Sequence, residues 1–152
     1  MTDHLSIAIA QINPTVGDLS GNLKRIRSTA AKAAESGADL VIFGELVVSG
    51  YSPEDLVLKP AFQEAVECSV LDLAGETKDG NPGLLIGAPW RIDGVLHNAA
   101  IMLDDGEISA VRLKHQLPNY GVFDEKRVFQ SGPLPGPISF RGIRLGVMIC
   151  ED

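Results

Sequence analysis

The chain has 152 residues, of which 45% are hydrophobic, and its 13 basic and 20 acidic residues give a formal net charge of −7. This length and composition predict a single globular domain. The acidic balance and the scattered basic residues argue against nucleic-acid binding, and no segment has the length of a membrane span or the pattern of a signal peptide. We therefore expect neither a nucleic-acid nor a membrane partner, and a cytoplasmic location by default.

The first half of the chain alternates between apolar runs and amphipathic segments. Residues 5–12 predict a buried strand, and residues 18–37 predict a helix with one apolar face. Residues 39–43 predict a second buried strand, so a β-α-β unit with parallel strands is expected. Residues 60–74 predict a second helix, because a proline stands at its first position and apolar residues recur at helical spacing.

The second half reads as a meander followed by a long loop. Residues 84–90 predict a strand, and turn signals pair residues 96–103 with residues 107–113. Residues 116–137 are rich in glycine, proline and aromatic residues, and a loop of this length inside a compact domain is usually functional. Together the segments predict an α/β fold with a mixed sheet.

Three polar residues stand where apolar segments end. Glu45 follows the strand at residues 39–43, Lys114 follows the strand at residues 107–113, and Cys150 ends a last apolar strand. Taken singly, each has a plainer interpretation, as a loop charge, an edge lysine and a small buried side chain. Together they supply a proton carrier, a cation and a nucleophile, which is a complete set for acyl transfer.

The two cysteines form neither a disulfide framework nor a metal-type spacing, so we expect thiols in a reducing compartment and no metal site. Cys68 lies off the apolar face of its helix, and we assign it no chemistry.

Three segments carry a family resemblance. Residues 44–56 read Gly-Glu-Leu-Val-Val-Ser-Gly-Tyr-Ser-Pro-Glu-Asp-Leu, residues 114–127 read Lys-His-Gln-Leu-Pro-Asn-Tyr-Gly-Val-Phe-Asp-Glu-Lys-Arg, and residues 146–152 read Gly-Val-Met-Ile-Cys-Glu-Asp. Together they resemble the nitrilase or carbon-nitrogen hydrolase superfamily, and the first two resemble in particular the glutaminase domains of glutamine-dependent NAD synthetases. The family usually has proline where this chain has Gly44, and often a second proline at Ser52.

The resemblance implies a nitrilase-type, four-layer α-β-β-α sandwich. Residues 1–152 would form the N-terminal portion of a carbon-nitrogen hydrolase (glutaminase) domain. The remainder of that domain and an ATP-dependent synthetase domain would lie outside this chain.

The chemistry expected of the three residues is amide hydrolysis through a thioester. Cys150 attacks the amide carbon, and Glu45 takes the thiol proton and returns it to the departing nitrogen. Lys114 favours the thiolate and stabilises the oxyanion. By resemblance, Tyr120 contacts the substrate and Glu125 helps to hold the lysine. Phe123 fits a wall of the substrate pocket, and core packing under the long loop explains it equally well.

The implied function is that of a ligase in NAD biosynthesis. The glutaminase part would hydrolyse L-glutamine without a cofactor, and the synthetase domain would use the ammonia and ATP to amidate deamido-NAD. The full-length protein is expected to be a homo-oligomer. Two alternatives stay open: a free-standing nitrilase-type amidase for another small amide, and a non-catalytic fragment that binds a complementary half or its own copy. We expect the isolated chain to be inactive.

Overall fold

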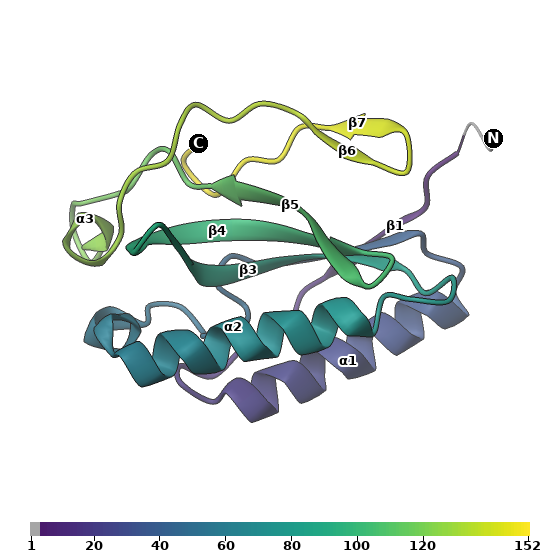
Figure 1. Cartoon of the computed structure of the whole chain (residues 1–152), viewed down its shortest axis with the longest axis horizontal. Coiled ribbons are helices and arrows are strands. Elements are labelled where there is room, and N and C mark those ends of the chain that lie inside the picture. Colours follow the sequence, from purple (N-terminus) through teal and green to yellow (C-terminus); the bar gives the residue numbers. More distant parts are fainter. Residues whose placement is uncertain (1–3) are drawn as a thin grey trace.

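A computed structural model describes residues 4–152 as a layered α/β structure. A five-stranded sheet forms the middle layer, two long helices lie against one face, and a two-stranded hairpin lies against the other (Figure 1). None of the helices within residues 4–152 combines the length and the apolar composition that a membrane span requires. The α/β class with a mixed sheet is confirmed.

The five strands follow one another across the sheet in chain order. β1 (Ile7–Ala10) pairs in parallel with β2 (Leu40–Phe43), and β2 pairs in parallel with β3 (Gly83–Ile92). β4 (Val95–Asp104) and β5 (Glu107–Leu113) then continue antiparallel. The pairing predicted for residues 96–103 and 107–113 is therefore confirmed, and the parallel strands end at one edge of the sheet.

The helices begin where local residue chemistry favours a start. α1 (Leu19–Glu35) is capped by Asp18, whose side chain accepts a hydrogen bond from the Gly21 N–H at 2.9 Å. α2 (Pro60–Gly75) has proline at its first position, where the missing N–H costs no helical hydrogen bond. Both helices lie where the sequence predicts them.

Alternation along the strands divides the core into two sides, because successive side chains of a strand point to opposite faces. Val41 and Phe43 of β2 pack with the helices, whereas Leu40 belongs to the cluster under the hairpin. The hairpin consists of β6 (Ile138–Phe140) and β7 (Ile143–Leu145). Its cluster is formed by six buried residues: Leu40, Leu85, Met102, Ile138, Phe140 and Val147.

Two predicted strands differ from the structure. β7 ends at Leu145, so the prediction of a strand that reaches Cys150 is wrong. Its partner β6 has only three residues and offers no further pairing positions. β1 is shorter than residues 5–12, and its predicted burial is wrong on one face, because Ile7 and Ile9 are 44% and 78% exposed.

Two short helical segments were not predicted. A 3₁₀ helix, η1, spans Glu54–Leu58, and α3 spans Glu125–Val128 within the segment predicted as an irregular loop. A small apolar cluster lies beneath them, formed by Leu46, Val57, Leu117 and Phe129. This cluster fixes the loops that follow β2 and β5, which carry the polar residues described next.

Candidate active site

Glu45 lies in a loop that packs directly on the backbone of β3. A Cβ atom at Gly87 of β3 would lie 2.3 Å from the Leu46 nitrogen and 2.7 Å from the Gly44 oxygen. The Val48 N–H donates to the Gly87 carbonyl at 3.1 Å. Because only glycine allows this close approach, Gly87 sets the position of the turn that carries Glu45.

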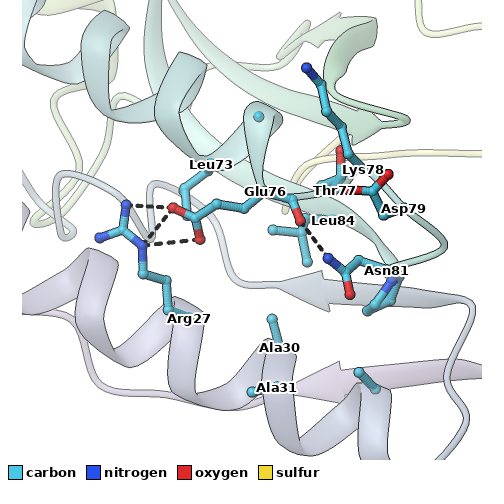
Figure 2. Close-up of a pocket in the computed structure, with 13 residues that line it drawn as sticks. Arg27, Ala30, Ala31, Leu73, Glu76, Thr77, Lys78, Asp79, Asn81 and Leu84 are labelled. Carbon is cyan, nitrogen blue, oxygen red and sulfur yellow. Dashed lines mark hydrogen bonds and ion pairs between the residues drawn. The ribbon is translucent and has the colours of Figure 1, made fainter.

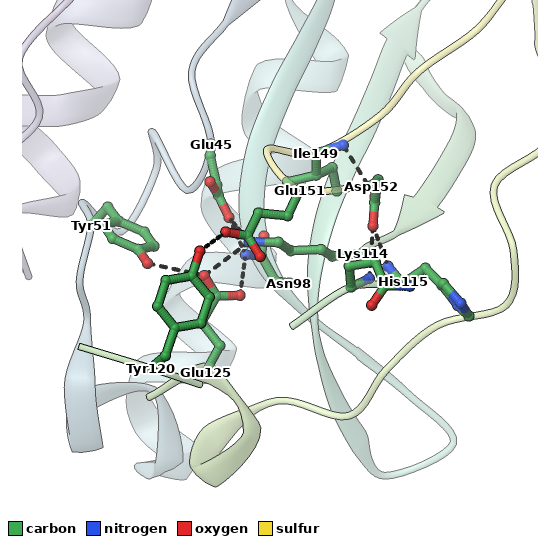
Figure 3. A network of polar contacts seen from close by, with 11 residues as sticks. Glu45, Tyr51, Asn98, Lys114, His115, Tyr120, Glu125, Ile149, Glu151 and Asp152 are labelled. Carbon is green, nitrogen blue, oxygen red and sulfur yellow. Dashed lines mark hydrogen bonds and ion pairs between the residues drawn. The ribbon is translucent and has the colours of Figure 1, made fainter. Parts of the chain in front are cut away.

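Lys114 is fully buried at the end of β5, with 0% of its side chain exposed. Its backbone is held on both sides, since its N–H donates to the Asn98 carbonyl and its carbonyl accepts from the Gly132 N–H, both at 2.8 Å. Its Nζ lies 2.7 Å from Glu45 Oε1 and 2.9 Å from Glu125 Oε1 (Figure 3). A buried ammonium is tolerated only with such partners.

The structure thus brings Glu45, Lys114 and Glu125 into direct contact. Burial alone lowers the pKa of Lys114, but hydrogen bonds to the two carboxylates outweigh it and raise that pKa above the ordinary value. Lys114 is therefore a permanent cation at neutral pH. A side chain with a raised pKa of this kind holds a fixed positive charge and does not exchange protons readily at neutral pH.

Two further residues join this cluster. Asn98 of β4 donates through Nδ2 to Glu45 Oε1 at 2.7 Å and to Glu125 Oε2 at 3.3 Å. The Tyr51 hydroxyl donates to Glu125 Oε1 at 3.0 Å. Sequence reasoning assigned no role to either residue. The available signals were an asparagine in the middle of a mostly apolar strand, and the place of Tyr51 within the first family segment.

Cys150 lies in a turn beyond β7 with φ = 53°, in the left-handed region that side chains seldom adopt. It lines a cavity of about 120 Å³ together with Glu45. Burial of the thiol and then the charge of Glu45 raise its pKa above the ordinary value, and Lys114 opposes them. The thiol is therefore protonated at neutral pH and needs a base to become a nucleophile.

Asp152 anchors the turn that carries Cys150. Its Oδ1 accepts the backbone N–H groups of His115 and Gln116, both at 2.8 Å, and its Oδ2 accepts the Ile149 N–H at 3.1 Å. These bonds connect the turn that carries Cys150 to the backbone that follows Lys114 (Figure 3). The sequence did not indicate this role.

Tyr120 and Phe123 lie on the rim of the site. Tyr120 is 59% exposed, and its hydroxyl donates to Glu151. The ring of Phe123 packs edge-on against Tyr120, with centroids 5.6 Å apart, and lies 6.5 Å from the ring of Tyr51. The three rings thus form one aromatic group, and the hydroxyl of Tyr51 within it contacts Glu125.

Other features do not belong to this cluster. Cys68 is exposed on α2. A cavity of about 420 Å³ lies between α1 and the turn after α2, beside the Arg27–Glu76 ion pair, and none of the predicted site residues lines it (Figure 2).

A second cavity, of about 500 Å³, lies at the ends of β1 and β2. Glu45 and Tyr51 both line it, so this cavity adjoins the cluster.

The arrangement therefore contains a protonated thiol, a carboxylate in the same cavity, and a permanent cation bound to that carboxylate. These are the parts needed for acyl transfer through a cysteine. Residues 6–152 match the carbon-nitrogen hydrolase family.

The chain belongs to this family. Among related carbon-nitrogen hydrolases, the glutamine-dependent NAD(+) synthetase of Rhodobacter capsulatus is 42% identical over 152 residues, which are 100% of this chain and 27% of that protein. The chain thus spans about a quarter of the length of the curated relatives it matches.

Solved structures of carbon-nitrogen hydrolases agree with this fold. The glutamine-dependent NAD+ synthetase of Acinetobacter baumannii, in complex with ADP, superposes with a TM-score of 0.88 at 37% identity, covering 96% of this chain and 27% of that one. A mutant amidase from Nesterenkonia sp. AN1 gives 0.80 at 28% identity, covering 97% and 57%. That structure shows the result of Michael addition of acrylamide at the amidase's active-site cysteine. The nitrilase-type fold, of which this chain covers part, is confirmed.

Proposed function

We propose that residues 1–152 are the N-terminal portion of the glutaminase domain of a glutamine-dependent NAD synthetase. The observation that carries the proposal is the contact of Glu45 with a permanently charged Lys114, in a cavity that Cys150 also lines. The similarity to NAD synthetases along the whole chain supports glutamine as the substrate.

The proposed reaction has two halves, and Glu45 takes up and returns one proton in each. Glu45 takes the thiol proton while the sulfur of Cys150 bonds to the amide carbon, and Lys114 stabilises the oxygen that becomes negative. Glu45 then gives the proton to nitrogen, the C–N bond breaks, and ammonia leaves. Water attacks the thioester with Glu45 as base, and the thiol recovers its proton as glutamate is released.

Glu125, Tyr120 and Phe123 have supporting roles in this proposal. Glu125 binds the second side of the Lys114 ammonium and so directs it toward the reacting carbonyl. Tyr120 and Phe123 form a wall that contacts the glutamine side chain from the rim.

In the full-length protein, the ammonia would pass to a synthetase domain that uses ATP to amidate deamido-NAD. We further propose that the full-length protein is a cytoplasmic homo-oligomer and that its glutaminase step needs no cofactor. The decisive experiment measures glutamate and NAD formation by the full-length protein supplied with glutamine, ATP and deamido-NAD. We expect both products; glutamate formation without NAD would contradict the synthetase part.

A second candidate is an amidase for another small amide, which the similarity to the Nesterenkonia amidase favours. Comparing glutamine with propionamide and acrylamide as substrates separates the two. A higher kcat/KM for a simple amide than for glutamine would favour this candidate.

A further inference from the structure

Asn98 lies at the centre of the charged cluster, although it carries no charge. It is 1% exposed, and its single side-chain NH₂ group donates to two different carboxylates, Glu45 and Glu125. The same two carboxylates share the ammonium of Lys114 (Figure 3). The cluster thus has two negative charges and one positive charge, with a neutral donor between the carboxylates.

We propose that Asn98 is a positioning residue for the proposed amide hydrolysis: its amide fixes one oxygen of Glu45 and leaves the other to exchange a proton with Cys150. This inference rests on the proposed function. It assigns Asn98 a task in the reaction through Glu45, without contact between Asn98 and the substrate.

The hydrogen bonds from Lys114 and Asn98 to Glu45 support different roles for the two carboxylate oxygens of Glu45. Lys114 and Asn98 both reach Oε1 of Glu45, each at 2.7 Å. Two donors on one oxygen hold the plane of the carboxylate and direct proton transfer to Oε2. A second cation in place of Asn98 would stabilise the ionised carboxylate further and weaken it as a base, whereas an amide adds a donor without charge.

The hydrogen bonds of Asn98 differ from those of a structural asparagine. Its Oδ1 is buried and has no hydrogen-bond partner among residues 4–152. Asn22, which is also buried, uses both ends: Nδ2 donates to the carbonyls of Thr15 and Val48, and Oδ1 accepts the Thr15 N–H. Asn98 therefore leaves a buried acceptor unpaired in order to direct its NH₂ at the two carboxylates.

The test uses Asn98→Leu and Asn98→Thr in the full-length protein. Leucine has a similar size and no donor, and threonine suits a strand but has one O–H, which serves at most one carboxylate. The probe is alkylation of Cys150 by iodoacetamide, measured against pH. Without the Asn98 donor the negative charge of Glu45 is less screened, and because that charge raises the pKa of the Cys150 thiol, alkylation should require a higher pH.

With glutamine, we expect kcat at neutral pH to fall about 100-fold with an unchanged KM, because proton transfer and not binding is impaired. Asn22→Leu is the matched control: it should lower the melting temperature and leave the pH profile in place.

The two readouts separate the inference from the proposed function. If the alkylation profile shifts but the protein does not hydrolyse glutamine, the positioning role of Asn98 is supported and glutamine is excluded as the substrate. An unshifted profile in either folded variant, or a raised KM with an unchanged kcat, would overturn the inference.

Discussion

The carboxylate of Asp152 accepts the backbone N–H of His115 at 2.8 Å, and His115 directly follows Lys114. The turn that carries the thiol is therefore attached to the backbone that carries the cation. Neither residue has a reacting group in the proposed mechanism, yet their contact fixes the position of Cys150 relative to Lys114. A substitution at Asp152 can therefore test the geometry of the site without changing Cys150 or Lys114.

Asp152→Ala removes the acceptor of three backbone N–H groups. We expect the free energy of unfolding to fall by about 1–3 kcal/mol and glutamine hydrolysis to fall with it, because the Cys150 turn is no longer fixed. Chemical denaturation and a glutamate assay measure the two effects. Glu64→Ala, an exposed acidic residue on α2, removes the same charge and should change neither.

Cys150→Ala should abolish glutamine-dependent NAD synthesis in the full-length protein and leave ammonia-dependent synthesis nearly intact. In the proposed mechanism, the thiol is needed only to release ammonia from glutamine. Parallel assays with glutamine and with ammonium chloride test this on one preparation. An equal loss in both assays would show that the cysteine is structural.

Lys114→Arg keeps the charge but replaces a compact ammonium by a planar fork, and we expect it to lose most of the glutaminase activity. Lys114→Ala leaves two carboxylates beside each other without their cation, which should cost about 3–5 kcal/mol of stability. It should also slow iodoacetamide alkylation of Cys150, because Lys114 lowers the pKa of that thiol. Lys24→Ala, on the exposed side of α1, is the control.

Glu45→Gln should make the thiol of Cys150 easier to alkylate and at the same time slow glutamine hydrolysis. The charge of Glu45 is one cause of the raised pKa of Cys150, after burial, so its removal lowers that pKa. The pH at which alkylation reaches half its maximum should then decrease. Glutamine hydrolysis should nevertheless fall by about 100-fold or more, because the proton carrier is gone. Alkylation that needs a higher pH in the variant would contradict this account of the thiol.

Gly87→Ala should disturb the site from the neighbouring strand. The new Cβ would meet backbone atoms of the loop that carries Glu45, so the loop must move. We expect lower stability and a lower kcat, measured by thermal unfolding and glutamate release. Gly136→Ala introduces the same group where no other atom lies within 4 Å, and should be neutral.

The fold was predictable where residue patterns are long and local. α1 has a capping aspartate, α2 begins with proline, both have helical spacing, and the β4–β5 hairpin has a turn signal, so their positions follow from the sequence. The exposed face of β1 was missed, because a run of apolar residues does not show which of its two faces is covered.

Parts of the candidate site were less predictable. Glu45, Lys114 and Cys150 could be named from their places at segment ends, and the structure places Glu45 in contact with Lys114 and in one cavity with Cys150. Asn98 contributes through a side chain whose partners lie 53 and 27 residues away. Contacts of such separation are set by strand register and loop packing, which spacing in the sequence does not encode.

The left-handed backbone at Cys150 restricts which nucleophile this turn can hold. At φ = 53°, Cβ lies close to the residue's own carbonyl oxygen, so a side chain branched at Cβ would clash more than an unbranched one. Serine could therefore replace the thiol by a hydroxyl on the same backbone, but threonine could not do so without reshaping the turn. The shape of the main chain at position 150 thus limits which side chain could act as the nucleophile of the proposed reaction.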